Sequence, residues 1–265
     1  MPKLKAILKR LFLYIILIYV GLCLYIYSIQ ESLIFFPVKA DYSHKTGTNV
    51  EEVIYKVNGV KLHGWLVNKH MAKEKLIMYY GGNAEDVYYN VNDFSNLKAA
   101  SLLINYRGYG YSEGRPGEKV LFSDALAILK AARANYKPKR IIIFGRSVGT
   151  GIATYVASQV PNNGVILITP FDSMTKLAAG HYPLYPVSLI LKHRFDSTKY
   201  APAITSSVLV IYGSKDHIVP NIRTEKLLQF INSKFRRVKI EGADHNNIAG
   251  YRKYREEIVK FIDGV

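Results

Sequence analysis

The sequence predicts an α/β protein in which a mainly parallel, doubly wound sheet follows one N-terminal transmembrane helix. From residue 50 onward, short apolar runs typical of strands alternate with helix-compatible segments, as in a parallel sheet covered by helices on both faces. An uncharged apolar run lies near the N-terminus. The 265 residues, 49% of them hydrophobic, suffice for one large core, so we expect one domain after the helix.

The N-terminal segment predicts a membrane anchor. Residues 1–10 carry four Lys or Arg side chains, and residues 11–29 carry no charge. As a helix this run extends about 28 Å, close to the roughly 30 Å hydrocarbon thickness of a bilayer. A cleaved signal peptide is the alternative, but its apolar region is usually shorter and a small-x-small cleavage site is missing. The positive-inside rule keeps the N-terminus cytoplasmic and puts residues 30–265 outside the cytoplasm, at the periplasmic or outer face in a bacterium.

The sequence predicts eight strands, which occur along the chain in the following order. Residues 50–57 and 60–67 form a hairpin joined by an Asn58-Gly59 turn. Six further apolar runs are typical of strands: residues 76–80, 101–106, 140–145, 165–169, 207–213 and 236–242. Residues 121–133 show apolar side chains at helical spacing, which indicates one of the covering helices.

Residues 171–202 break the alternation with many aromatic residues and prolines. We expect a cap-like insert whose apolar side chains bind an acyl chain, with Leu184 and Tyr185 as candidate substrate contacts. The alternative is scaffold packing, in which the prolines simply end short helices.

The strongest chemical signal is Gly-Arg-Ser-Val-Gly at residues 145–149, which follows a strand-like run and precedes a small-residue helix start. A strand that ends in G-x-S-x-G and opens a helix forms a nucleophile elbow. We therefore predict Ser147 as a nucleophile at a helix N-terminus, where the dipole favours developing negative charge. A phosphate-binding glycine turn is the alternative, but the Lys-Ser/Thr pair of such loops is missing.

A serine nucleophile needs a base, which an acid must orient. In enzymes with this elbow the chain order is serine, acid, histidine. Of the seven histidines, only His245 lies between the last predicted strand and the last amphipathic segment, so it is the predicted base. Asp216, just after the strand at residues 207–213, is the predicted acid, and Asp172 is its rival.

Acyl transfer also needs an oxyanion hole. One donor is the backbone N–H after the nucleophile, here Val148, and the other comes from the loop after an early strand. Residues 79–84, Tyr-Tyr-Gly-Gly-Asn-Ala, leave the strand at residues 76–80 in the expected place. We assign the second donor to Asn83, with Gly82 allowing close approach of the substrate. A glycine turn without this role is the alternative.

Several stretches together resemble one family: QESLIFFP, YGGNAED, YRGYGYSEGRPGE, FGRSVGTG, PVSLILKHRFDS, YGSKDHIVP and the final ADHN. They are similar to the membrane-anchored α/β-hydrolase-domain branch of the serine aminopeptidase-like hydrolase superfamily. That branch includes eukaryotic protein depalmitoylases, lysophospholipases and bacterial relatives. The resemblance covers residues 28–263 and implies an α/β-hydrolase fold with Ser147, Asp216 and His245 as its catalytic triad and Asn83 in its oxyanion hole.

Two positions depart from the family pattern. Gly81 stands where the family has a histidine in the oxyanion loop. Asp244 replaces the glycine before the terminal histidine, which puts a carboxylate next to the predicted base in the chain.

The charge and the cysteine content limit which ligands and binding partners we expect. The formal charge of +16 comes from scattered Lys and Arg residues without a nucleic-acid-binding motif, so we expect no nucleic acid and favour a basic surface near anionic lipid. Cys23 is the single cysteine, which excludes an intramolecular disulfide and a cysteine-based zinc site. Because serine-based acyl transfer needs neither, we expect no cofactor and no metal.

The sequence therefore predicts a membrane-anchored serine hydrolase that cleaves carboxylic ester or thioester bonds of acyl or lipid-like small molecules. A serine peptidase or amidase of the same fold is an alternative; an acidic cluster for a substrate amine would favour it, and the insert offers only Asp172 and Asp196. A non-catalytic binding protein on this scaffold is the third possibility, which the loss of a triad residue would favour.

Overall fold

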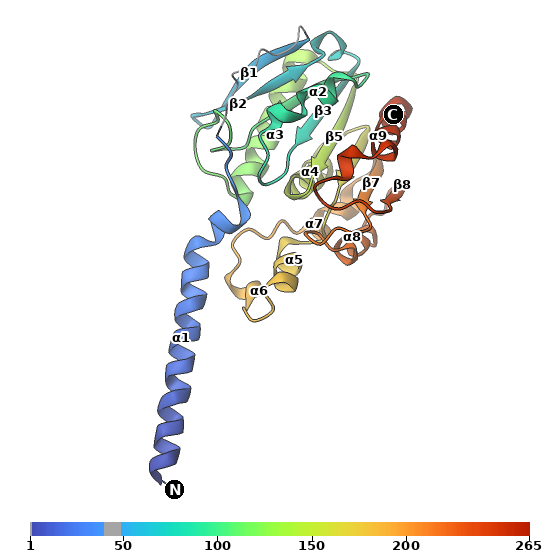
Figure 1. Cartoon of the computed structure of the whole chain (residues 1–265). Coiled ribbons are helices and arrows are strands. Elements are labelled where there is room, and N and C mark those ends of the chain that lie inside the picture. The colour runs from blue at the N-terminus through green and yellow to red at the C-terminus, as the bar shows by residue number, and fades with distance from the viewer. Residues whose placement is uncertain (1, 40–48) are drawn as a thin grey trace.

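An eight-stranded sheet forms the centre of the α/β domain (Figure 1). The computed structural model describes residues 2–39 and 49–265, and the strand order is β1-β2-β4-β3-β5-β6-β7-β8. The strands are β1 (Val50–Val57), β2 (Val60–Val67), β3 (Lys75–Tyr80), β4 (Ala100–Ile104), β5 (Arg140–Arg146), β6 (Gly164–Ile168), β7 (Ser207–Gly213) and β8 (Phe235–Ile240). β2 runs antiparallel to its neighbours β1 and β4, and β3 to β8 are parallel to one another. The predicted mainly parallel sheet is confirmed.

The predicted hairpin joins β1 and β2. Asn58 and Gly59 have φ angles of 49° and 81°, and the hairpin register pairs Val57 with Val60. Two consecutive positive φ angles match the twist of the flanking strands in a two-residue turn, which explains why asparagine and glycine stand here.

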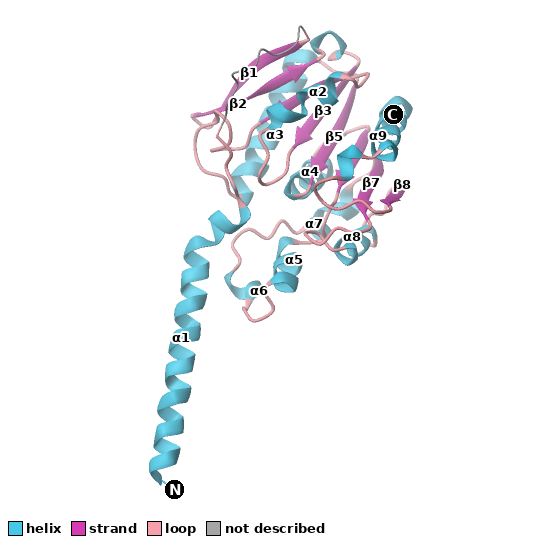
Figure 2. Ribbon diagram, in the orientation of Figure 1, coloured by secondary structure: helices cyan, strands magenta, loops and turns pink. Residues whose placement is uncertain are grey.

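Helices cover both faces of the sheet, as Figure 2 shows. One face carries α3 (Glu118–Tyr136), α4 (Val148–Gln159) and α8 (Asn221–Leu228), and the other carries α2 (Val91–Ser95) and α9 (Arg252–Gly264). Short 3-10 turns lie at η1 (Lys69–Met71), η2 (Val87–Asn90), η3 (Ala201–Ala203) and η4 (Ile248–Gly250). In β5, Ile141 and Ile143 belong to one core, while Ile142 and Phe144 belong to the other. Because side chains alternate along a strand, a fully apolar β5 fills both cores.

The insert predicted at residues 171–202 divides into two parts. It contains α5 (Met174–His181), α6 (Val187–Ile190) and α7 (Ser197–Tyr200). The part with α5 and α6 extends beside α1 below the sheet (Figure 1). The later part is scaffold: Phe195 and Ala201 are fully buried, and Phe195 packs so closely on α4 that a Cβ at Gly151 would lie 3.1 Å from it.

The N-terminal helix α1 (Pro2–Ile34) contains the predicted span and continues past it. It is long and apolar enough to cross a membrane, as either an anchor or a signal sequence would be. Its end enters the domain, where Ile34 and Phe35 are buried in the core beneath the sheet. The helix and the domain are therefore joined by packing as well as by the chain.

Candidate active site

Ser147 stands in the sharp turn between β5 and α4. Its φ is 51° and its ψ is −121°, a conformation that costs a non-glycine residue roughly 1–3 kcal/mol. The turn needs glycine on both sides: a Cβ on Gly145 would lie 2.5 Å from the Gly149 carbonyl oxygen, and a Cβ on Gly149 would lie 2.1 Å from that of Tyr80. The strand, turn and helix thus have the arrangement of a nucleophile elbow.

The structure brings the three predicted triad residues together. Nε2 of His245 lies 2.9 Å from Oγ of Ser147, and Nδ1 of His245 lies 2.8 Å from Oδ2 of Asp216. Both His245 and Asp216 are buried. The carboxylate accepts a hydrogen bond from the Nδ1–H group, which leaves Nε2 as the acceptor for the serine hydroxyl.

Backbone hydrogen bonds orient the Asp216 carboxylate toward His245, whereas the rival Asp172 pairs with a different residue. Oδ1 of Asp216 accepts the backbone N–H groups of Ile218 at 3.0 Å and Val219 at 2.7 Å, which leaves Oδ2 facing the histidine. Asp172 instead pairs with Arg223, whose Nη1 lies 3.1 Å from its Oδ2. Burial raises the pKa of Asp172, although Arg223 opposes this.

The side chain of Asp244, the residue before the predicted base, points toward the backbone of the loop to which it belongs. Its Oδ1 accepts the backbone N–H groups of Asn246 at 2.8 Å and Asn247 at 2.9 Å. These hydrogen bonds lower the pKa of Asp244. The carboxylate therefore stabilises the turn that carries His245.

The loop after β3 brings Asn83 to the same cavity as Ser147, and Val148 opens α4 beside it. The carbonyl oxygen of Asn83 accepts the Phe36 N–H at 3.0 Å and the Tyr109 hydroxyl at 2.5 Å. Its Nδ2 donates to the Ile34 carbonyl at 3.3 Å. The predicted oxyanion loop is therefore fastened to the end of α1. Sequence patterns gave no sign of this link.

Glu85 is a further residue that the sequence analysis missed. Its largely buried carboxylate accepts hydrogen bonds from Tyr79 Oη at 2.6 Å, Gly82 N at 3.1 Å, Asn90 Nδ2 at 2.7 Å and Arg146 Nη1 at 3.2 Å. One side chain thus connects the oxyanion loop to the residue before Ser147. Its position three residues after Gly82, in a loop that leaves a strand, was the available signal.

Glu85 also explains the departure at Gly81. A Cβ on Gly81 would lie 2.7 Å from Oε1 of Glu85. The carboxylate is held by its four partners, so a larger residue at position 81 would have to displace it. The position of the Glu85 carboxylate therefore requires a residue without a side chain at position 81.

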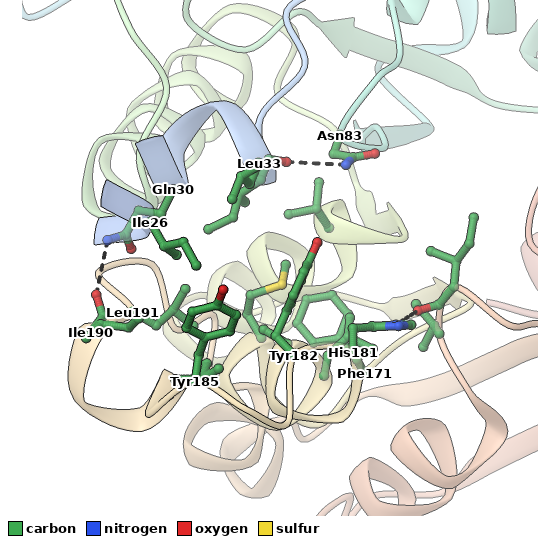
Figure 3. A pocket seen from close by; sticks show the side chains of 18 of the residues that line it. Ile26, Gln30, Leu33, Asn83, Phe171, His181, Tyr182, Tyr185, Ile190 and Leu191 are labelled. Carbon is green, nitrogen blue, oxygen red and sulfur yellow. Dashed lines mark hydrogen bonds between the residues drawn. The ribbon is translucent and has the colours of Figure 1, made fainter. Parts of the chain in front are cut away.

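A cavity of about 250 Å³ leads to Ser147 (Figure 3). One wall is the end of α1, with Ile26, Gln30 and Leu33, and the opposite wall is the insert. Of the predicted substrate contacts, Tyr185 lines the cavity, as do Asn83 and Val148. Leu184 does not: its side chain is 80% exposed. Gly82 lies beside the cavity, where a Cβ would be 3.9 Å from the Cβ of Ser147.

Comparison with known proteins identifies the family and the fold. A family model described as the alpha/beta hydrolase fold matches residues 62–192. The Mycobacterium tuberculosis (strain H37Rv) protein Rv2307c is 30% identical over 236 residues, which cover 86% of this chain and 84% of that protein. The chain belongs to the α/β-hydrolase family. Within it, human alpha/beta hydrolase domain-containing protein 17B is 28% identical over 192 residues, or 70% of this chain and 65% of that protein.

Solved structures show the same α/β-hydrolase fold. The Pyrococcus furiosus esterase Pf2001 superposes with a TM-score of 0.68 at 17% identity, covering 87% of this chain and 97% of the esterase. An acetyl xylan esterase from Paenibacillus sp. R4 has a TM-score of 0.67 at 19% identity, covering 85% of this chain and 86% of that enzyme. At these identities the likeness concerns the fold.

Proposed function

We propose that this α/β-hydrolase is a membrane-anchored serine hydrolase that cleaves carboxylic ester or thioester bonds of acyl or lipid-like substrates. The observation that carries the proposal is the hydrogen-bonded series Ser147, His245 and Asp216, whose serine lines an apolar cavity. A serine, a base and an orienting acid in this order of contacts form the apparatus for covalent acyl transfer.

The proposed reaction has two steps. Oγ of Ser147 attacks the acyl carbon while Nε2 of His245 takes the hydroxyl proton. The bond to the leaving alcohol or thiol then breaks, and His245 returns the proton to that group. In the second step His245 takes a proton from water, whose oxygen attacks the acyl carbon. The bond from that carbon to Oγ of Ser147 then breaks, His245 returns the proton to Oγ, and the carboxylic acid leaves. Backbone N–H groups of Val148 and Asn83 stabilise the oxyanion in both steps.

The cavity favours an acyl substrate over a peptide. Among the described residues that line it there is no Asp, Glu, Lys or Arg. The two acidic residues of the insert are engaged elsewhere, Asp172 with Arg223 and Asp196 with Lys199. A free substrate amine would therefore meet no carboxylate, whereas an acyl chain would bury apolar surface against apolar walls.

The membrane part of the proposal rests on α1. Four basic residues precede an uncharged run from Leu11 to Ile29 inside this helix, which favours a single span with a cytoplasmic N-terminus. The hydrolase domain would then act on the opposite side of the membrane, at the periplasmic or outer face of a bacterium.

A fluorophosphonate probe tests the catalytic proposal. The full-length protein should be labelled, and Ser147→Ala should lose both labelling and ester turnover, since removal of a triad serine costs on the order of a million-fold in rate. Ser158→Ala is the matched control, because Ser158 lies in α4 and bonds the Tyr155 carbonyl of its own helix. Labelling of Ser147→Ala would refute the nucleophile. Labelling of wild type with turnover of amides but not esters would favour the peptidase or amidase.

A further inference from the structure

Residues 182–191, which follow α5 and include α6, lie against the apolar length of α1. The Tyr19 hydroxyl donates to the Leu184 carbonyl at 2.9 Å, and Nε2 of Gln30 donates to the Ile190 carbonyl at 3.0 Å. From residue 19 to residue 30 the helix rises about 16 Å, roughly half the hydrocarbon thickness of a bilayer. With α1 spanning the membrane, as in the proposed function on which this inference rests, the segment lies at the depth of one leaflet.

The composition of residues 182–191 suits that depth. These ten residues, YPLYPVSLIL, carry no charge, and the next three are Lys192, His193 and Arg194. Leu184 is 80% exposed and Leu189 is 81% exposed, although both are large and apolar. In water such side chains are costly to expose together, whereas in hydrocarbon they are in their preferred solvent.

Most backbone N–H groups of this segment have hydrogen-bond partners, as a lipid environment requires. Prolines at positions 183 and 186 have no N–H to satisfy. Backbone carbonyls within the insert accept the N–H groups of Tyr182, Tyr185, Val187, Leu189, Ile190 and Leu191. The polar side chains of α1, Tyr19 and Gln30, satisfy two of its carbonyls.

The basic end of the segment lies at the level expected for lipid headgroups. Nζ of Lys192 is 4.3 Å from the ring centroid of Tyr27, close to the end of the uncharged run of α1. The ammonium group of Lys192 therefore lies over an aromatic ring at the level where lipid phosphates are expected, and tyrosine is enriched at the same interface.

We propose that residues 182–191 insert into the leaflet on the side of the hydrolase domain, and that the substrate is an acyl lipid of that leaflet. The cavity lies between this segment and the last turns of α1, so both of its walls border the bilayer (Figure 3). An acyl chain can pass from the leaflet to Ser147 along apolar surface, without the cost of exposing it to water. The anchor is thereby also a wall of the substrate site.

Tryptophan quenching by lipid tests the insertion. Full-length Leu189→Trp is compared with Ile54→Trp, an exposed apolar position on β1, in phosphatidylcholine vesicles whose acyl chains carry bromine. Both variants share the buried native Trp65 as a common background. Brominated lipid should quench most of the emission that Leu189→Trp adds and leave that of Ile54→Trp unchanged. Equal quenching in the two variants would overturn the insertion.

Surface dilution tests the route of the substrate. A long-chain ester embedded in vesicles at constant bulk amount is diluted with inert phosphatidylcholine, and the rate should fall in proportion to its mole fraction in the bilayer. A rate that follows the bulk amount alone would overturn access from the leaflet. Turnover of a soluble acetyl ester on the same sample separates the two proposals: if it and fluorophosphonate labelling are both absent, the hydrolase proposal fails, and quenching still decides the insertion.

Discussion

The backbone N–H of Lys192 donates to Oε1 of Gln30 at 2.7 Å, which joins the end of α1 to the insert beside the cavity that Ser147 lines. The same buried side chain donates to the Ile190 carbonyl, so both ends of its amide are used. Ile34 and Phe36, just beyond it, bond the loop that carries Asn83. Helix α1 is therefore connected to both the cavity wall and the predicted oxyanion loop, and five predictions test this arrangement and the proposed site.

Replacing Gln30 with leucine should loosen the cavity wall. The change leaves the Lys192 N–H and the Ile190 carbonyl without their partner. Both hydrogen bonds are only partly buried, so the cost of each lost partner should lie near the lower end of about 1–3 kcal/mol. We expect kcat/KM to fall more for long-chain esters than for an acetyl ester. Ser32→Ala is the control, because the Ser32 hydroxyl donates to the Ile29 carbonyl of its own helix and the residue is exposed. An equal loss for all chain lengths in Gln30→Leu would argue against a role in the wall.

Asp216→Asn should impair catalysis and preserve the fold. The asparagine carbonyl can still accept the Ile218 and Val219 N–H groups, but its amide no longer holds the required tautomer of His245. By analogy with serine triads, kcat should fall roughly ten-thousand-fold. The comparison is Asp172→Asn, measured by ester turnover and thermal unfolding. If Asp172→Asn were the variant that lost turnover at unchanged stability, Asp172 would be the acid.

Glu85→Ala should destabilise the domain. It breaks a mostly buried pair with Arg146 and leaves the partners of the carboxylate unsatisfied, so we expect a loss of about 3 kcal/mol in the free energy of unfolding. Glu74→Ala is the matched control, because its pair with Lys139 is exposed and its loss should leave stability nearly unchanged. Denaturant titration with intrinsic fluorescence measures both. Equal midpoints for the two variants would contradict the proposed role of Glu85.

Chain-length specificity should depend on the cavity. Each buried methylene contributes roughly 0.8 kcal/mol, or about fourfold in affinity, until the cavity is full. In wild type, kcat/KM for detergent-dispersed esters should therefore climb with acyl length and then level off. Tyr185→Ala, which removes a lining ring, should change this profile, and Ile222→Ala, an exposed position on α8, should not. A flat wild-type profile would show that the cavity does not bind the chain.

The proposed topology predicts resistance to extraction. The full-length protein should remain in membranes after alkaline carbonate treatment, since about twenty apolar residues partition stably into the bilayer. Protease added from the non-cytoplasmic side should degrade the hydrolase domain, and protease added from the cytoplasmic side should not. Release by carbonate would exclude the anchor, and the opposite protease pattern would reverse the orientation.

Local patterns in the sequence determined the sheet, the elbow and the positions of Ser147, Asp216 and His245 along the chain. Alternation of apolar runs and helical spacing reflects packing on both faces of a sheet, which each segment encodes by itself. The order of serine, acid and histidine follows from strand connectivity, because the loops after parallel strands meet at one edge.

The tertiary structure alone decided which surfaces meet. Nothing local to residues 26–34 indicates that they form a cavity wall with a segment about 160 positions later, because the apolar side chains among them could equally well continue a membrane span. Likewise, Leu184 and Tyr185 are adjacent apolar residues of one insert, yet only Tyr185 lines the cavity. Glu85 reads as a charged loop residue until folding places four donors around it. Such contacts depend on how elements far apart in the sequence pack together. The residue spacing within one element does not indicate this packing.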